Sequence, residues 1–229
     1  MPLTSMTETA HLPLPAVPGA RGRAVILLVR PLARAIDWAP LAVVAAFGAG
    51  LLTLVQAGRP LSAGAALVLM RVVGTLLGSA AAFALVDAMA TDLGAAAVPR
   101  WARQALRCVL AGGVAVVLWL AAFAYALSRL PEGTLFPVTD LLVEMAFCLG
   151  VALAAAAAAV RHATGRQAAM AAVLVQLGLV MATLLLPDRL VLWPPTCGAG
   201  HWEEAHRFWF AMLPVPYAWL AFACRDLRR

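Results

Sequence analysis

The chain has 229 residues, of which 64% are hydrophobic and 12% are charged, and its formal net charge at pH 7 is +6. A soluble domain has about 45–50% apolar and about 25% charged residues, so a core of this size cannot bury the excess of apolar side chains. The composition therefore excludes an ordinary soluble domain and predicts an all-α, polytopic integral membrane protein. It does not favour nucleic-acid binding, because the basic residues flank apolar runs and form no basic stripe.

The N-terminal part is predicted to lie outside the bilayer. Residues 1–20 are proline-rich and have no apolar core, which predicts a disordered cytoplasmic tail and no cleavable signal peptide. Residues 21–37 are apolar, flanked by arginines and too short to span. They predict an amphipathic helix that lies in the inner membrane interface.

Six apolar segments follow and predict a six-helix transmembrane domain over residues 38–224, before a basic cytoplasmic tail at 225–229. The segments cover residues 38–57, 63–86, 106–127, 138–160, 168–186 and 204–224. Pro214 and Pro216 interrupt the last segment and predict a hinge. Residues 187–202 are too apolar for a solvated loop, and we expect them to form a hairpin that enters the outer leaflet part way.

The arginines indicate the orientation, since an even number of spans puts both termini on one side. The side of the termini carries Arg21, Arg23, Arg30, Arg34, Arg100, Arg103, Arg107, Arg161, Arg166, Arg225, Arg228 and Arg229. The opposite side carries only Arg59, Arg129, Arg189 and Arg207. The positive-inside rule then predicts both termini in the cytoplasm. All basic residues are arginine and the chain is rich in Ala, Leu and Val, which indicates a GC-rich bacterial genome and hence a bacterial inner membrane.

Two charged residues lie inside predicted spans at similar depth. Arg71 is about 12 Å from the outer end of the second span, and Glu144 is about 9 Å from the outer end of the fourth, at about 1.5 Å per residue. A charge at such depth must be paired or face water. We expect an Arg71–Glu144 ion pair, with Asp140 as a shallower alternative partner. The pair either lines an outward-facing substrate path or is structural, within this chain or with a neighbouring subunit.

Small residues in the second span predict close helix packing. Gly74, Gly78 and Ala82 recur at intervals of four residues and form one stripe on a helix. In lipid, such a stripe favours helix association because it lets two backbones approach closely. The partner helix belongs either to this chain or to another subunit.

The connection between the second and third spans, residues 87–104, mixes acidic, basic and interface-type residues. We single out Asp87, Thr91, Asp92, Pro99, Arg100, Trp101, Arg103 and Arg107. Thr91 and Asp92 favour a helix cap, and Pro99 favours the start of the next helix. This loop is either a contact for a soluble partner or a plain solvated connector.

No enzyme or metal motif is evident. Five residues near the sixth span are types that can bind zinc: Cys197, His201, Glu203, Glu204 and His206. Their spacing is not that of an HExxH site, so a polar entry to the span is the better interpretation, and no metal is predicted. No P-loop, GxGxxG, GxSxG or CxxC motif occurs, so we assign no catalytic residue, no bound cofactor and no ATP hydrolysis to this chain.

The layout resembles the short six-helix permease subunits of bacterial ATP-binding-cassette exporters, of the type-2 exporter class in its actinobacterial form. Those subunits open with an elbow helix, like residues 21–36. Their second span ends in an acidic residue before a Pro/Arg-rich coupling loop, as from Asp87 to Arg103. They place an apolar element between the fifth and sixth spans, like residues 187–202. The resemblance runs from Arg21 to Arg229 and is one of layout and composition; a single Asp87 stands where a doubled acid is expected.

The resemblance implies a permease subunit that pairs with itself or with a second permease. Two cytoplasmic ATPase subunits would bind the ATP and dock under the coupling loop, and a hydrophobic or amphipathic cargo would be exported. Two other classes stay open. One is a membrane anchor or assembly subunit that transports nothing. The other is an integral-membrane enzyme acting on lipids, for which Arg71, Asp140 and Glu144 are the candidate polar groups.

Overall fold

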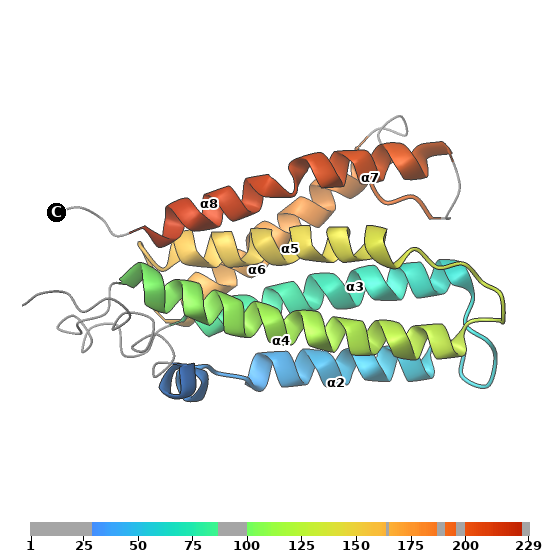
Figure 1. Ribbon diagram of the computed structural model, residues 1–229, viewed down its shortest axis with the longest axis horizontal. Helices are drawn as coiled ribbons and strands as arrows, with labels where there is room; N and C mark the ends of the chain where they lie inside the picture. The colour runs from blue at the N-terminus through green and yellow to red at the C-terminus, as the bar shows by residue number, and fades with distance from the viewer. Residues whose placement is uncertain (1–28, 87–99, 164, 187–190, 196–199, 226–229) are drawn as a thin grey trace, which may run out of the picture.

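The structure is a computed structural model that describes residues 29–86, 100–163, 165–186, 191–195 and 200–225. Within these ranges it contains helices and no strand, as the composition predicts. The helices are Val29–Ala35, α2 (Ala39–Leu54), α3 (Ala63–Ala82), η1 (Phe83–Leu85), α4 (Arg100–Arg129), α5 (Val138–Ala159), α6 (Arg166–Leu184), α7 (Gly200–Met212) and α8 (Pro214–Cys224). They form an elongated bundle with α2 along one edge and α7 and α8 along the other (Figure 1).

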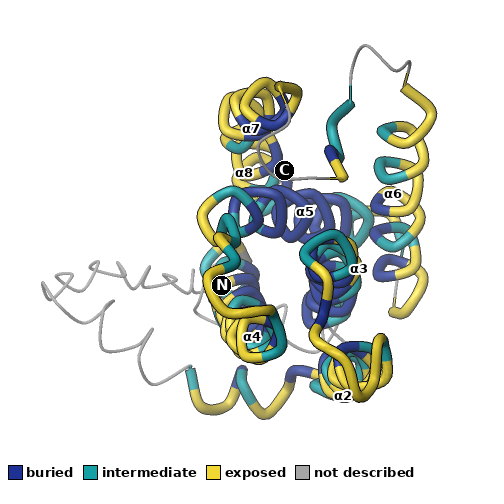
Figure 2. The backbone as a smooth tube through the Cα atoms, turned by 90° about the vertical axis from the view of Figure 1, so that its right-hand side faces the viewer, coloured by how far each residue is buried: buried dark blue, intermediate teal, exposed yellow. Residues whose placement is uncertain are grey.

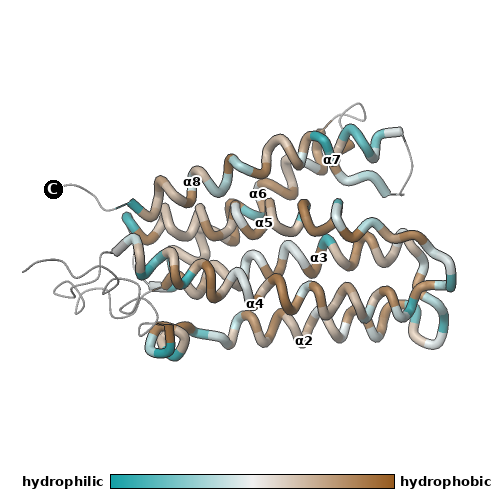
Figure 3. Tube along the Cα trace, in the orientation of Figure 1, coloured by the Kyte–Doolittle hydropathy of each residue, from teal (hydrophilic) through white to brown (hydrophobic). Residues whose placement is uncertain are grey.

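Four helices of the described residues are long and apolar enough to cross a membrane. They are Ala63–Leu85, Trp101–Arg129, Val138–Ala159 and Arg166–Leu184. A fifth candidate is the pair Val29–Ala35 and α2, which meet at an angle of 69°. Apolar residues run along the length of the helices, and polar residues are concentrated toward the ends of the bundle (Figure 3). For the described residues, the prediction of an all-helical fold is therefore confirmed, and four or five helices are long and apolar enough to span a membrane.

The bend before α2 is held by side chains next to it. Trp38 Nε1 donates to the carbonyl oxygen of Ala33 at 2.7 Å, which ties the start of α2 to the preceding helix. Asp37 Oδ1 accepts from the Ala39 backbone N–H at 3.1 Å, and Pro40 lies in the first turn, where its missing N–H costs no helix hydrogen bond. These local signals turn a short apolar helix sharply into a longer one.

Helix α5 occupies the centre of the bundle. In its most apolar 18-residue stretch, 83% of the residues are buried, and Figure 2 shows α5 surrounded by α3, α4, α6 and α8. Small side chains allow this: Ala152 and Ala154 are fully buried, and a Cβ atom on Gly150 would lie only 3.2 Å from the ring of Pro216 in α8. Close approach of small residues is how membrane helices gain packing contacts.

Two predicted boundaries are wrong. Helix α4 begins at Arg100, not at residue 106, so the part of the predicted loop from 100 to 104 is helical. Its polar residues are good helix formers that hydropathy alone assigns to a loop. Helix α7 begins at Gly200, so the predicted hairpin does not extend to residue 202.

Helices α7 and α8 continue one another. The connecting residue, Leu213, has helical torsions (φ −54°, ψ −39°), and its N–H still donates to Trp209 at 2.9 Å. Pro214 and Pro216 lie in the first turn of α8, and their missing N–H groups interrupt the hydrogen-bond ladder there. The two helices run nearly in line (Figure 1), so the prolines interrupt the ladder with little change of direction.

A candidate functional site: a buried polar cluster on α3, α5 and α7

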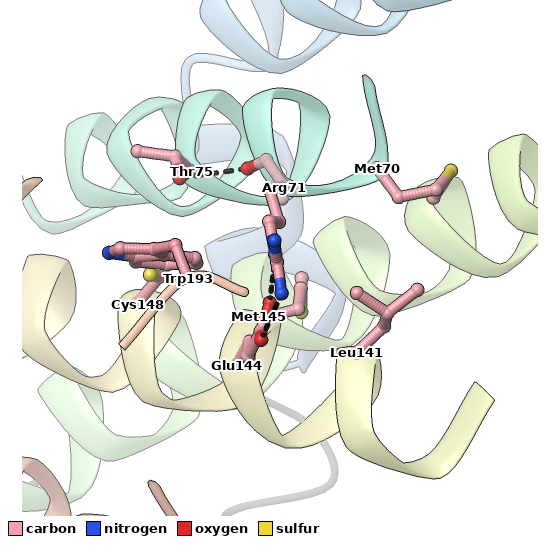
Figure 4. A pocket seen from close by; sticks show the side chains of 9 residues that line it. Met70, Arg71, Thr75, Leu141, Glu144, Met145, Cys148 and Trp193 are labelled. Carbon is pink, nitrogen blue, oxygen red and sulfur yellow. Dashed lines mark hydrogen bonds and ion pairs between the residues drawn. The ribbon is translucent and has the colours of Figure 1, made fainter. Parts of the chain in front are cut away.

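The polar cluster is built around an ion pair between α3 and α5. Arg71 donates from Nε to Glu144 Oε2 at 2.8 Å and from Nη2 to Glu144 Oε1 at 2.9 Å (Figure 4). The two side chains are 10% and 3% exposed. The structure thus brings together the two charges that the sequence places at similar depth. A two-point arginine–carboxylate pair fixes both side chains and fits the arginine fork better than it would fit lysine.

The pair also holds the segment between α6 and α7. Arg71 Nη1 donates to the carbonyl oxygen of Pro194 at 2.8 Å, and the guanidinium lies 5.3 Å from the ring of Trp193. Trp193 Nε1 donates to Thr183 of α6 at 2.8 Å, while Trp209 Nε1 of α7 donates to the Leu192 carbonyl at 3.0 Å. Residues 191–195 are therefore folded against the helices, and the backbone carbonyls of Leu192 and Pro194 accept from protein donors, which is what non-helical chain needs where water is excluded. Residues 187–190 and 196–199 of the predicted hairpin lie outside the described residues.

His206 is the third charged or titratable member, and the sequence analysis did not place it with Glu144. Its Nε2 lies 3.1 Å from Glu144 Oε1, and its Nδ1 lies 2.8 Å from the Trp202 carbonyl oxygen. The imidazole stacks on Trp202 with ring centroids 4.3 Å apart. Trp202 Nε1 in turn donates to Asp140 Oδ2 at 2.7 Å. Asp140, predicted as an alternative partner of Arg71, thus binds α7 through Trp202.

The residues considered for zinc are not gathered into one site. His206 is 4% exposed and faces Glu144. Glu203 pairs with Arg207 at the surface, and His201 lies 3.8 Å from Glu204, with all four side chains at least half exposed. Cys197 lies outside the described residues. Within the described part of the chain, no group of three His, Cys, Asp or Glu side chains could hold a metal ion.

A small cavity of about 10 Å³ lies beside the ion pair, lined by residues of α3 and α5 and by Trp193 (Figure 4). Its polar lining comes from Arg71, Glu144, Thr75 and Cys148. The volume is about that of one water-sized probe, which is too small for a substrate. Both oxygens of Glu144 accept hydrogen bonds from Arg71, so the pair ties α3 to α5.

The predicted small-residue stripe packs within the chain. A Cβ atom on Gly78 would lie 3.2 Å from the Leu149 Cα atom of α5, and one on Gly74 would lie 3.2 Å from Trp119 Nε1 of α4. Ala82 is fully buried. The stripe therefore packs against α5 and α4 within this chain.

The second group of predicted site residues is only partly described. Asp87, Thr91, Asp92 and Pro99 lie outside the described residues. The remaining residues, which are Arg100, Trp101, Arg103 and Arg107, form the first turns of α4. Trp101 is 53% exposed, whereas Arg107 is 3% exposed and its Nη1 lies 3.4 Å from the Val86 carbonyl oxygen at the end of α3 and η1. The structure thus places these four residues in helix α4 and not in a loop.

Comparison with known proteins adds no identification. No protein-family model, curated protein or solved structure matches the chain.

Proposed function

We propose that the chain is the transmembrane permease subunit of a bacterial ATP-binding-cassette exporter, with six spans and both termini in the cytoplasm. The spans would be α2, α3 with η1, α4, α5, α6, and α7 continued by α8. The last of these runs from Gly200 to Cys224. Twenty-odd residues are enough to cross a bilayer when the two halves are nearly collinear.

The observation that carries the proposal is the 69° bend between Val29–Ala35 and α2. A short helix at this angle to a bundle of membrane spans lies along the membrane surface when the bundle stands upright. Its exposed Arg30 and Arg34 suit lipid phosphates at the inner face. This is the arrangement expected of an elbow helix that a cytoplasmic subunit can push.

The start of α4, which is helical, supports a way for a partner at the cytoplasmic face to move this helix. Because Arg100 and Arg103 belong to a helix of 30 residues, a force applied to the end of α4 is transmitted along the whole helix. An ATPase docked under residues 87–107 would therefore move α4 as a rigid body. Residues 191–195, held by Arg71, would sit at the opposite end and close the outer side.

Two partners follow from this proposal. A second permease subunit, identical or different, would complete the transport path, and two cytoplasmic ATPase subunits would supply the energy. The chain is rich in Ala, Leu and Val, and a transport path lined by these residues would suit a hydrophobic or amphipathic cargo. In contrast, a lipid-modifying enzyme built on Glu144 is disfavoured, because that carboxylate is 3% exposed and engaged by Arg71.

The test is purification of the tagged chain from bacterial membranes together with the products of its neighbouring genes. We expect a nucleotide-binding ATPase in the complex, and we expect Asp92→Ala with Arg100→Ala to lower its ATP hydrolysis in lipid nanodiscs. Glu132→Ala is the matched control, since Glu132 is exposed in the turn between α4 and α5 at the other end of the bundle. An intact complex without an ATPase, or equal losses in the control, would refute the proposal.

A further inference from the structure

His206 lies between two oxygen atoms, and this geometry sets its protonation. Its Nδ1 is 2.8 Å from the Trp202 carbonyl oxygen and its Nε2 is 3.1 Å from Glu144 Oε1. A carbonyl oxygen can only accept a hydrogen bond, so Nδ1 must carry a proton. A neutral imidazole has one N–H, which would leave the Nε2 lone pair opposite a carboxylate oxygen.

We propose that this cluster is a proton-binding site, in which His206 is an imidazolium that bridges the Trp202 carbonyl to the carboxylate of Glu144. Both ring nitrogens then carry a proton: Nδ1 donates to the Trp202 carbonyl oxygen, and the positive Nε2–H lies 3.1 Å from Glu144 Oε1 as an ion pair. The added proton belongs on His206 and not on Glu144, because both Glu144 oxygens already accept from Arg71. A protonated carboxyl group would leave the buried guanidinium without its counter-charge.

The charges around the site favour the added proton. The groups that face His206 or its partners are Arg71 on α3, and Glu144 and Asp140 on α5. Residues 191–195 contribute no titratable side chain. With His206 protonated, two positive groups balance two carboxylates; without the proton, the cluster has a net negative charge. A balanced cluster is the less costly one to hold away from water.

The proton on His206 also links α7 to the Arg71–Glu144 pair of α3 and α5. On α7, His206 stacks on Trp202, and through Glu144 and Arg71 it is linked to the Pro194 carbonyl oxygen. Loss of the proton replaces the ion pair between His206 of α7 and Glu144 of α5 with a lone pair facing a carboxylate, and it leaves the bond from Trp202 to Asp140 in place. Proton binding therefore stabilises the packed position of α7, and this holds whether or not the chain transports a cargo.

The direct test uses a protein in which His206 is the one histidine, made with H11Q, H162Q and H201Q. His162 and His201 are exposed, and His11 lies outside the described residues. We expect nitrogen NMR of labelled histidine, in lipid nanodiscs at about pH 7.5, to show an imidazolium with two protonated ring nitrogens. An exposed histidine is mostly neutral at that pH, about one unit above its ordinary pKa. A neutral imidazole signal from His206 would overturn the proposal.

A second test measures how the thermal stability of the protein depends on pH. Because the folded state holds a proton that the unfolded chain releases, the apparent Tm should fall as the pH rises from about 6 to about 9. H201Q is the matched control on the same helix and should keep this dependence, while H206Q should lose most of it. An unchanged dependence in H206Q would contradict the proposal, and if H206Q does not fold, the NMR result on the single-histidine protein decides.

Discussion

Helices α5 and α6 are neighbours that the sequence describes in nearly the same terms, yet the structure gives them opposite environments. Both are apolar enough to cross a membrane, but 83% of the most apolar stretch of α5 is buried against 22% of that of α6. Helix α6 exposes large side chains: Met170, Leu174, Leu177, Met181 and Leu184. Lipid is as apolar as leucine, so hydropathy does not separate a central helix from a peripheral one.

Helices α5 and α6 differ in the size of their side chains and in whether they carry a buried charge. Helix α5 has a run of alanines and Gly150, which let α3, α6 and α8 approach, and it carries the carboxylate that binds Arg71 and His206. Helix α6 contributes fewer contacts of this kind; one is the Thr183 hydroxyl that accepts from Trp193. Helix α5 therefore makes the central packing contacts of the bundle, whereas the outer face of α6 is available for lipid or another subunit.

The largest effect should come from Glu144→Ala. The substitution leaves Arg71 buried without its counter-charge, and removing one partner of a buried ion pair costs about 3–5 kcal/mol. Thermal unfolding in lipid nanodiscs measures the loss. Glu203→Ala is the control, since its pair with Arg207 is more than three-quarters exposed and of little consequence. An equal loss of stability in both variants would show that the buried pair on α5 contributes no more than an exposed pair.

Gly78→Ala should come next. Its Cβ atom would lie 3.2 Å from a backbone atom of α5, which cannot move aside without shifting the helix. Overpacking of this kind costs about 1–3 kcal/mol. On α6, Gly178→Ala meets nothing within 4 Å and should be neutral or stabilising. The same unfolding measurement compares them, and the comparison between the helices fails if Gly178→Ala is the more harmful.

Leu149→Ala tests packing without charge. Leu149 of α5 is 5% exposed and Leu174 of α6 is 64% exposed. In water a buried Leu→Ala change costs about 2–5 kcal/mol, but in lipid only the cavity part of that cost remains, so we expect about 1–2 kcal/mol. Leu174→Ala should change the apparent Tm little. A larger loss at Leu174 would indicate that α6 faces another protein and not lipid.

The smallest effect is expected at Thr183→Val on α6. The change removes the acceptor for Trp193 Nε1 and keeps the shape of the side chain. Hydrogen bonds between membrane segments contribute about 0.6 kcal/mol on average, so the change in Tm should be small. Thr53→Val on α2 is the control, because that hydroxyl bonds only the Gly50 carbonyl of its own helix. A loss as large as that of Glu144→Ala would contradict the peripheral role of α6.

Much of the fold could be predicted because long apolar runs identify membrane helices. The predicted span 138–160 agrees with α5 at Val138–Ala159, and 63–86 agrees with α3 and η1 together. The ends of the helices were harder to predict than their apolar middles. Arg100 and Arg103 are helical although they are charged, because the end of a membrane helix can protrude into water, where hydropathy no longer marks it.

The sequence by itself determined that the chain is helical and apolar, and equal depth in two spans was enough to predict the Arg71–Glu144 pair. Only the tertiary structure added His206 and the Pro194 carbonyl to that pair, because they come from segments whose position depends on packing. It also gave two arginines a local role. Arg129 donates to carbonyl oxygens in the last turn of α2 and in the residues that follow it, and Arg161 donates to the carbonyl oxygens of Phe222 in α8 and of Arg225 just after it. From the sequence, these arginines indicate only the side of the membrane on which their loops are expected to lie. Which helix end each one caps depends on which helices pack side by side, and that contact is long-range in the sequence.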